Sequence, residues 1–214
     1  MADNYEKMME KARLLFCSEG MEKAAAKPFV RSDEDYFYAE LAGETFRVSR
    51  TDGRVQCLRS PEFAEDADFS CTMTIYDLLT HENGNVQPAG AYCTIDSVNP
   101  TKVSYGHIGG GNDNRARYYD ENCVLFAKAC QRLGTPVSGP GDLAFSIPLF
   151  SFMDVQVRLW FGDEEFPPQL QIMVDKNILS FILFETVYYA AAHILNRIDG
   201  EMSLCCRQCY AEIN

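Results

Sequence analysis

"DLAFSIPLFSFMDVQVRLWFGDEEFPPQLQIMV", residues 142–174, is the stretch that decides the fold of this chain. Three runs in it, at 142–150, 155–161 and 170–174, alternate apolar with polar side chains. Alternation with a period of two is typical of strands that bury one face. The loop at 162–169 then joins the last two strands as a hairpin. Pro148 indicates an edge or strand-end position for the first strand, because proline cannot donate to a sheet ladder.

The first half of the chain predicts a helix, a sheet and two more helices. Residues 3–25 repeat apolar side chains at helical spacing. "YFYAELAG", "ETFRVSR" and "RVQCLR" predict a short antiparallel meander with turns at 42–43 and 51–53. "CTMTIYDLLTHENG" predicts a helix ending at Gly84, and residues 118–134 predict an amphipathic helix ending at Gly134. The Gly- and Pro-rich residues 85–114 predict an irregular, mobile region.

The last predicted element is a long helix over residues 176–198. It is apolar almost all round between Ile178 and Ala192, which indicates a buried helix. Residues 199–214 form a cysteine-containing tail. The sequence therefore predicts a single α+β domain over residues 1–214, with a mostly antiparallel sheet, helices packed on one face and a long buried C-terminal helix.

Composition narrows the class of protein. The 214 residues carry a net charge of −12, which argues against nucleic acid and anionic membranes as partners and favours cationic partners or metal ions. The sequence has neither a signal peptide nor 18 consecutive apolar residues, so we expect a cytoplasmic protein. Nine cysteines, most of them single, indicate buried thiols in a reducing compartment.

The hairpin loop carries three consecutive acids, Asp163, Glu164 and Glu165, between Trp160 and a Pro-Pro pair. One interpretation is a rigid turn whose acids face water. The other is a carboxylate cluster on a stiff loop that binds a cation or a cationic substrate group. Neighbouring residues in extended chain point to opposite sides, so a metal site here would need ligands from elsewhere.

Glu185 is the one ionisable group in the apolar run "ILSFILFETVYY". A buried glutamate has to be paired or has to raise its pKa. It could form a structural ion pair, for instance with Arg158, or act as a catalytic or ligand-binding carboxylate. His193, eight residues later, falls near the same helix face and is interpreted as a core or surface histidine.

The glycine-rich run "GHIGGGNDN", residues 106–114, does not have the features of a phosphate-binding loop. It lacks the Gly-Lys-Ser/Thr ending and has no clear strand before it. We interpret it as a flexible loop that could close as a lid. If the protein is an enzyme, His107 on this loop is the best candidate for a general base.

The C-terminal segment "LCCRQCYAEIN" resembles a metal-binding sequence. Cys206 and Cys209 form a C-x-x-C pair, and Cys205 precedes them. Two thiolates at this spacing can chelate zinc or an iron of an iron–sulfur cluster, but a closed site needs four ligands. A redox dithiol and incidental thiols on a helix remain the alternatives.

Residues 141–191 as a whole resemble a bacterial and archaeal family known as DUF3786, a domain of unknown function. The features that carry the resemblance are Gly141-Asp142, the segment Trp160–Pro168, Asp175 and Glu185. The resemblance covers about residues 30–198. It implies a protein of anaerobes, and some family members carry a four-cysteine iron–sulfur domain that this chain lacks. It implies no reaction.

Three hypotheses for the function follow. The first is a non-catalytic accessory domain of anaerobic metabolism that binds a small ligand or a protein near the hairpin, with Asp142, Trp160, Asp163, Glu164, Glu165, Glu185 and His107 as candidate ligand-binding residues. The second is an enzyme that uses the carboxylates with His107. The third is a zinc, iron–sulfur or redox module built on Cys205, Cys206 and Cys209. A homodimer is compatible with each of them.

Overall fold

The computed structural model describes residues 4–82, 86–99 and 114–213, with side chains described up to residue 207. The chain divides into two compact units, which are described separately. Unit 1 comprises Met1–Pro88, Leu149–Phe152 and Asn177–Ala190, and unit 2 comprises Ala89–Pro148, Met153–Lys176 and Ala191–Asn214. The chain returns to unit 1 twice, so the two units are not consecutive stretches of sequence. The prediction of one domain over residues 1–214 stays a prediction.

The fold class is α+β, as predicted, with two five-stranded sheets whose paired strands are antiparallel. The first sheet has the order β1-β2-β3-β4-β5 and the second β6-β10-β9-β8-β7. The strands of the first sheet are β1 (Arg31–Ser32), β2 (Tyr36–Leu41), β3 (Glu44–Ser49), β4 (Val55–Ser60) and β5 (Phe63–Asp66). The strands of the second are β6 (Tyr92–Thr94), β7 (Thr135–Pro136), β8 (Leu143–Phe150), β9 (Met153–Trp160) and β10 (Gln169–Asp175).

The predicted meander of unit 1 is confirmed. Strands β2, β3 and β4 pair in sequence order. The turn between β2 and β3 places Ala42 at φ 52° and Gly43 at φ 74°, the left-handed pair that a two-residue hairpin needs. Burial alternates along β2 and β3, so one face of this sheet lies on the core.

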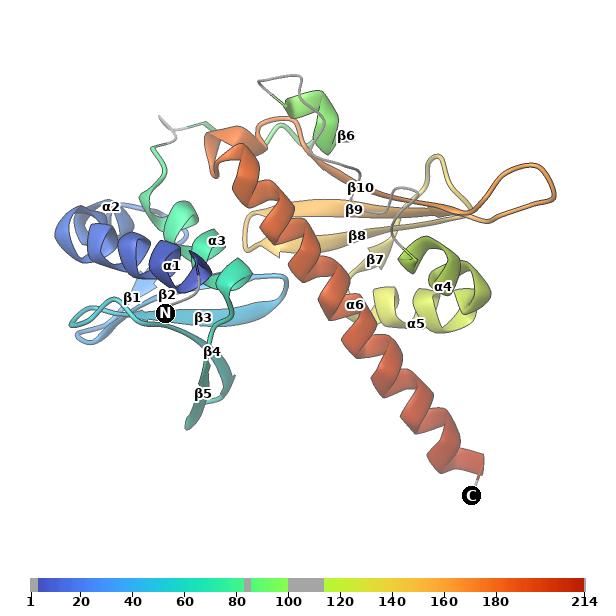
Figure 1. Ribbon diagram of the computed structural model, residues 1–214, viewed down its shortest axis with the longest axis horizontal. Helices are drawn as coiled ribbons and strands as arrows, with labels where there is room; N and C mark the ends of the chain where they lie inside the picture. The colour runs from blue at the N-terminus through green and yellow to red at the C-terminus, as the bar shows by residue number, and fades with distance from the viewer. Residues whose placement is uncertain (1–3, 83–85, 100–113, 214) are drawn as a thin grey trace. The chain divides into compact units, whose positions relative to one another are not determined.

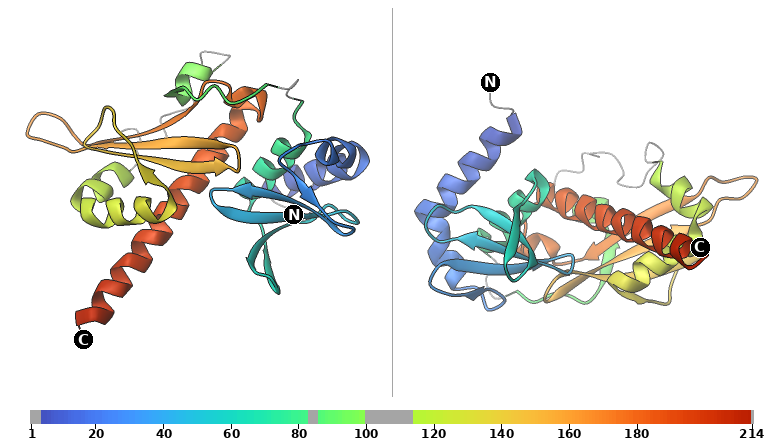
Figure 2. Two further views of the ribbon diagram at one scale, coloured as in Figure 1. Left: turned by 180° about the vertical axis from the view of Figure 1, so that it is seen from behind. Right: turned by 90° about the horizontal axis from the view of Figure 1, so that it is seen from below.

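Helices cover that buried face of unit 1 (Figures 1 and 2). The predicted N-terminal helix is confirmed as a continuous run of α1 (Asn4–Leu15), a π-helical turn (Phe16–Gly20) and α2 (Met21–Ala25). Phe16 is buried against Phe37 of β2 and Tyr76 of α3 (Phe69–Thr80). Gly20 is required by close packing, since a Cβ there would lie 2.8 Å from Thr80 Cγ2 of α3.

Helix α3 begins and ends earlier than its sequence suggested. The Asp68 carboxylate caps its N-terminus by accepting a hydrogen bond from the Cys71 N–H at 2.8 Å. The helix ends at Thr80, and His81 is already extended, so the predicted end at Gly84 is wrong. Gly84 itself lies outside the described residues.

Two later segments of the chain complete the core of unit 1. Phe152 packs against Phe29, with ring centroids 4.4 Å apart, and against Phe181, at 5.1 Å. The Ala42 N–H donates to the Leu149 carbonyl at 2.8 Å. The Leu183 N–H donates to the Asp77 carboxylate at 2.6 Å, just before α6 (Phe184–Ile213) begins.

The three strands predicted from residues 142–174 are confirmed as β8, β9 and β10. The pairing of Trp160 with Gln169 closes β9 and β10 into the predicted hairpin. β8 is an inner strand, but its pairing with β7 reaches only Ser146 and Phe145. Pro148 lies within β8, two residues before its end, and is exposed beyond the pairing with β7, so it is not at the strand end that the sequence predicted.

The region predicted to be irregular contributes to the second sheet. β6 pairs with β10, and a 3-10 turn (Ile95–Val98) follows it. The buried Asp175 carboxylate at the end of β10 accepts hydrogen bonds from the Ala89 and Gly90 N–H groups at 2.9 and 2.8 Å. A side chain distant in sequence therefore orders the chain that leads into β6.

The helix predicted over 118–134 is two helices, α4 (Arg115–Glu121) and α5 (Cys123–Leu133), which break at Asn122. Gly134 ends α5 as predicted. Phe126 of α5 stacks on Tyr119 of α4 and contacts Phe145 of β8 edge-to-face, so these helices cover the buried face of the second sheet. Arg115 and Tyr119 donate hydrogen bonds to the Asp199 carboxylate of α6, at 3.0 and 2.6 Å.

The C-terminal helix differs from the prediction at both ends. Ile178–Ser180 form a 3-10 turn, and α6 runs over Phe184–Ile213 rather than 176–198. It passes through Gly200, which has open space around it. No helix among the described residues is long and apolar enough to cross a membrane.

Candidate functional site

The β9–β10 loop, residues 161–168, extends beyond its strands in unit 2 (Figure 1) and is held at its base by two carboxylates. Asp142 Oδ2 accepts a hydrogen bond from the Phe161 N–H at 2.7 Å, and Asp120 Oδ2 accepts one from the Gly162 N–H at 3.2 Å. Gly162 also permits a close contact, since a Cβ there would lie 2.7 Å from Pro168 Cδ. The base of the loop is therefore fixed from three directions.

Asp163 organises the tip of the loop. Its Oδ1 accepts hydrogen bonds from the N–H groups of Glu165, at 2.8 Å, and Phe166, at 2.7 Å. Its own N–H donates to the Phe166 carbonyl at 2.9 Å. The two bonds, that from Phe166 first, lower the pKa of Asp163 below its usual value. A carboxylate held ionised in this way is a turn-forming group and a poor proton donor near neutral pH.

The other side chains of the tip face solvent. Phe166 is 62% exposed and Phe161 is 40% exposed, and both Glu164 and Glu165 are exposed. Trp160 is half-buried at the end of β9, where it pairs with Gln169. The whole loop, residues 161–168, is called the hairpin tip from here on. It presents two aromatic rings and two carboxylates on a constrained backbone.

Glu185 does not belong to this group. It lies in the first turn of α6 in unit 1, and the expectation that it is buried is wrong, because its side chain is exposed. It raises the pKa of the neighbouring Tyr189, second to the effect of burial. Arg158, the ion-pair partner suggested by the sequence, instead donates to the Pro140 carbonyl at 3.0 Å and to Gln156 Oε1 at 2.6 Å. His193 is buried, as the core interpretation requires.

Asp120 is the residue that sequence reasoning missed. It lies 42 residues before Gly162, in α4, and nothing in "YYDEN" distinguishes it from an ordinary helix-surface acid. Only the packing of α4 beside β9 and β10 brings it to the hairpin. His107, the candidate general base, lies outside the described residues, so the enzyme hypothesis built on it stays a prediction.

The C-terminal cysteines lie on α6. Cys205 is buried, its Sγ lies 3.8 Å from Arg132 Nη1, and Cys206 is half-buried. The Cys209 side chain lies outside the described part of the chain. Within the described side chains, no group of three His, Cys, Asp or Glu residues is placed to hold a metal ion. The zinc, iron–sulfur or redox hypothesis stays a prediction.

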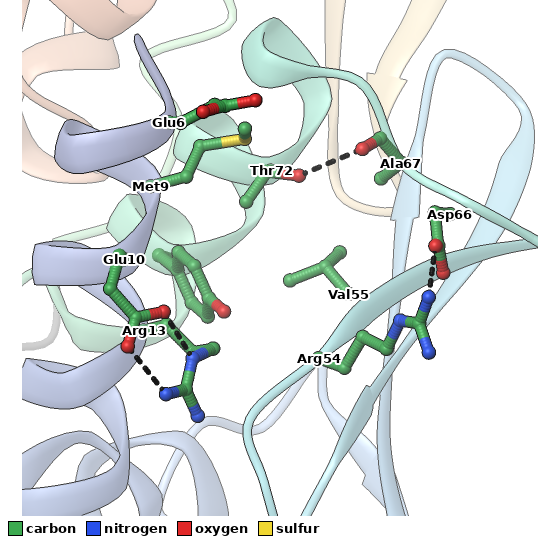
Figure 3. A pocket seen from close by; sticks show the side chains of 10 residues that line it. Glu6, Met9, Glu10, Arg13, Arg54, Val55, Asp66, Ala67 and Thr72 are labelled. Atoms are coloured by element: carbon green, nitrogen blue, oxygen red, sulfur yellow. Dashed lines mark hydrogen bonds and ion pairs between the residues drawn. The ribbon is translucent and has the colours of Figure 1, made fainter. Parts of the chain in front are cut away.

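A groove in unit 1 lies between α1, α3 and the β4–β5 pair (Figure 3). Its volume is about 250 Å³, and Met9, Val55 and Ala67 supply apolar surface. Glu10 pairs with Arg13 at 2.7 Å, and Asp66 pairs with Arg54. The Tyr76 hydroxyl donates to the Gly53 carbonyl, and burial raises the pKa of Tyr76.

The groove is a weak candidate for a small-molecule site. Ligand pockets usually enclose roughly 300–1,000 Å³ and present convergent polar groups. The charged pairs of this groove, Glu10 with Arg13 and Asp66 with Arg54, bind each other rather than converging on its interior. The hairpin tip is therefore the stronger candidate, since its exposed side chains serve no visible purpose in the core.

Comparison with known proteins gives a family. Searches of curated proteins and of solved structures gave no match. The sequence profile of a family described as "Domain of unknown function (DUF3786)" matches residues 21–197. The match includes Asp120, Asp142 and the hairpin tip, whereas α1 and the three C-terminal cysteines lie outside it. The chain therefore belongs to the DUF3786 family.

Proposed function

We propose that this chain is a non-catalytic accessory domain of anaerobic metabolism that docks onto a partner protein through the hairpin tip. The partner surface carries Lys or Arg side chains beside an apolar recess. The resemblance to proteins of anaerobes supports the metabolic setting. The docking role is argued from the hairpin itself.

The observation that carries this proposal is the contrast between the constrained backbone and the exposed side chains of residues 161–168. Three carboxylates, from Asp120, Asp142 and Asp163, fix the loop by hydrogen bonds to its N–H groups. Pro167 and Pro168 restrict it further. A loop held in one conformation loses little entropy when it binds, so its exposed groups are suited to recognition.

The exposed groups define the chemistry of the partner. An aromatic ring that is 62% exposed, that of Phe166, can act as the anchor of an interface when it enters an apolar recess. Glu164 and Glu165 precede Phe166 in the loop and would pair with Lys or Arg at the rim. The net charge of −12 adds long-range attraction toward a cationic surface.

The test is selection of peptides from a displayed random library on the purified full-length chain. We expect the selected peptides to combine Lys or Arg with apolar residues. In fluorescence anisotropy, the double variant Glu164→Gln/Glu165→Gln and the variant Phe166→Ala should each weaken binding at least about tenfold, or about 1.4 kcal/mol. Binding should also weaken as salt is added.

Matched control variants distinguish an effect of the hairpin side chains from an effect of net charge or of any exposed ring. Glu62→Gln/Glu121→Gln removes the same charge from two other exposed positions, and Phe63→Ala removes another exposed ring. Both controls should bind the peptides as the natural chain does. Selected peptides without cationic residues, or equal losses in the control variants, would contradict the proposal.

A further inference from the structure

A row of polar side chains crosses the whole sheet of unit 1 on its open face. The strand registers place five residues side by side, one from each strand: Arg31, Tyr38, Arg47, Gln56 and Asp66. The flanking residues Phe37, Phe46 and Cys57 point to the other face and are buried. The first four residues of the row therefore point away from α1–α3, which pack on that buried face, whereas Asp66 at the end of the row also lines the groove beside α1.

Two arginines of this face are stacked on tyrosine rings. Arg47 Cζ lies 4.4 Å from the centroid of Tyr36, and Arg31 Cζ lies 5.5 Å from that of Tyr38. Gln56 Oε1 accepts two hydrogen bonds from Arg47, at 2.9 and 3.0 Å, which fix the guanidinium further. A stacked guanidinium is preorganised to receive a carboxylate with little loss of side-chain entropy.

The charge of these two arginines is less neutralised by carboxylates than that of Arg13, Arg54 and Arg59. Arg13 and Arg59 each have a carboxylate oxygen within 3.0 Å, and Arg54 pairs closely with Asp66. Arg47, by contrast, contacts the neutral Gln56 amide and Tyr36 ring. The carboxylate of Glu40 lies 3.9 Å from Arg31, but it also accepts a hydrogen bond from Thr45 at 2.8 Å. The Asp33 carboxylate also lies at this face, where it accepts hydrogen bonds from the Tyr38 hydroxyl at 2.7 Å and from two backbone N–H groups. Because Glu40 and Asp33 are both engaged in these bonds, the two guanidiniums are available to an incoming carboxylate pair.

We infer that this face, defined by Arg31, Tyr36, Tyr38 and Arg47, receives the hairpin tip of a second copy of the chain. The inference rests on the proposed function, because it names a partner for the same tip. Glu164 and Glu165 supply carboxylates for Arg31 and Arg47. Phe166 and the adjoining prolines supply apolar surface for the two tyrosine rings. The complementarity is in both charge and polarity.

The net charge of −12 opposes association of two copies, but it acts over a longer range than the contact. At physiological salt the screening length is about 8 Å, so repulsion between distant charges is largely removed while touching pairs persist. We therefore expect association to be measurable at physiological salt. It should be weaker at low salt, where repulsion is unscreened.

The experiment is analytical ultracentrifugation of the full-length chain at physiological salt over a wide concentration range. We expect a mass that rises with concentration. Arg47→Glu and Glu164→Arg should each abolish the rise, and the chain carrying both changes should recover it, because the pair is then reversed. Lys11→Glu, an exposed site on α1 with the same charge change as Arg47→Glu, is the control and should associate normally.

The possible outcomes are distinct. A natural chain that stays monomeric at every concentration overturns the inference, as does association that survives both single changes. Circular dichroism of each variant shows whether it is folded, and recovery in the double variant excludes misfolding as the cause of the losses. If the chain is monomeric yet Glu164→Gln/Glu165→Gln loses peptide binding, the inference fails and the proposed function stands.

Discussion

The carboxylate of Asp163 accepts hydrogen bonds from two backbone N–H groups of its own loop. Because its folded-state pKa lies below the usual value, its hydrogen bonds favour the folded tip above pH about 4 and are lost as the pH falls through the folded pKa. We expect an NMR titration of the Asp163 carboxyl carbon to give a midpoint below 3.8, the reference value for an aspartate. A midpoint at or above that value would mean that the turn does not form in solution.

Asp175 has a structural role that can be measured. Its buried carboxylate accepts two backbone hydrogen bonds. Asp175→Ala leaves both N–H groups without this partner, and we expect the free energy of unfolding to fall by about 2–4 kcal/mol. Urea denaturation measures the change. Glu121→Ala, at an exposed helix position, should alter stability by less than about 0.5 kcal/mol, and an equal loss there would rule out this explanation.

The structural role of a single residue can be predicted from the sequence where that role depends on neighbouring residues. The Asp163 turn and the Ala42-Gly43 turn between β2 and β3 follow from neighbouring residues. The exposure of Glu185 does not follow from the apolar run before it, because that run is not one helix: it contains a 3-10 turn at Ile178–Ser180, and α6 begins only at Phe184. Asp120 could not be found, because its role depends on the packing of an element 42 residues away.

Substitutions at two helix glycines test the packing at the end of α5 and the continuity of α6. A Cβ at Gly134, the end of α5, would lie 2.0 Å from the Ser146 carbonyl oxygen of β8, so Gly134→Ala should destabilise the protein by more than about 2 kcal/mol. Gly200 in α6 has open space around it, so Gly200→Ala should stabilise by about 0.5–1 kcal/mol. Thermal unfolding of both variants tests this. A loss at Gly200 would show that α6 does not continue through that position.

Among the elements, strands were predicted more accurately than helix ends. Apolar and polar residues alternate in β8, β9 and β10 because each strand buries one face. These strands can therefore be predicted without knowing which strand pairs with which. Helix ends depend on tertiary contacts. The Asp77 carboxylate binds the chain just before α6, and α6 continues through an Asp-Gly pair that local rules interpret as a stop.

For the molecule as a whole, the order in which the chain visits its units predicts how fragments behave. Residues 1–88 hold every strand of the first sheet but lack Phe152 and Phe181, which pack in the core of unit 1. We expect this fragment to give a poorly dispersed NMR spectrum and to bind a hydrophobic dye. A well-dispersed spectrum would show that the two later segments are dispensable.

The late arrival of Phe152 and Phe181 also has a consequence for synthesis in the cell. Unit 1 gains its last segment only when Ala190 has been made, 102 residues after Pro88 (190 − 88). At roughly 5–20 residues per second, the nascent first sheet waits about 5–20 seconds for its remaining core. During that interval the part of its core against which Phe152 and Phe181 pack is exposed to the ribosome surface and to chaperones. The rate of translation, as well as the stability of the finished fold, therefore bears on the yield of this protein.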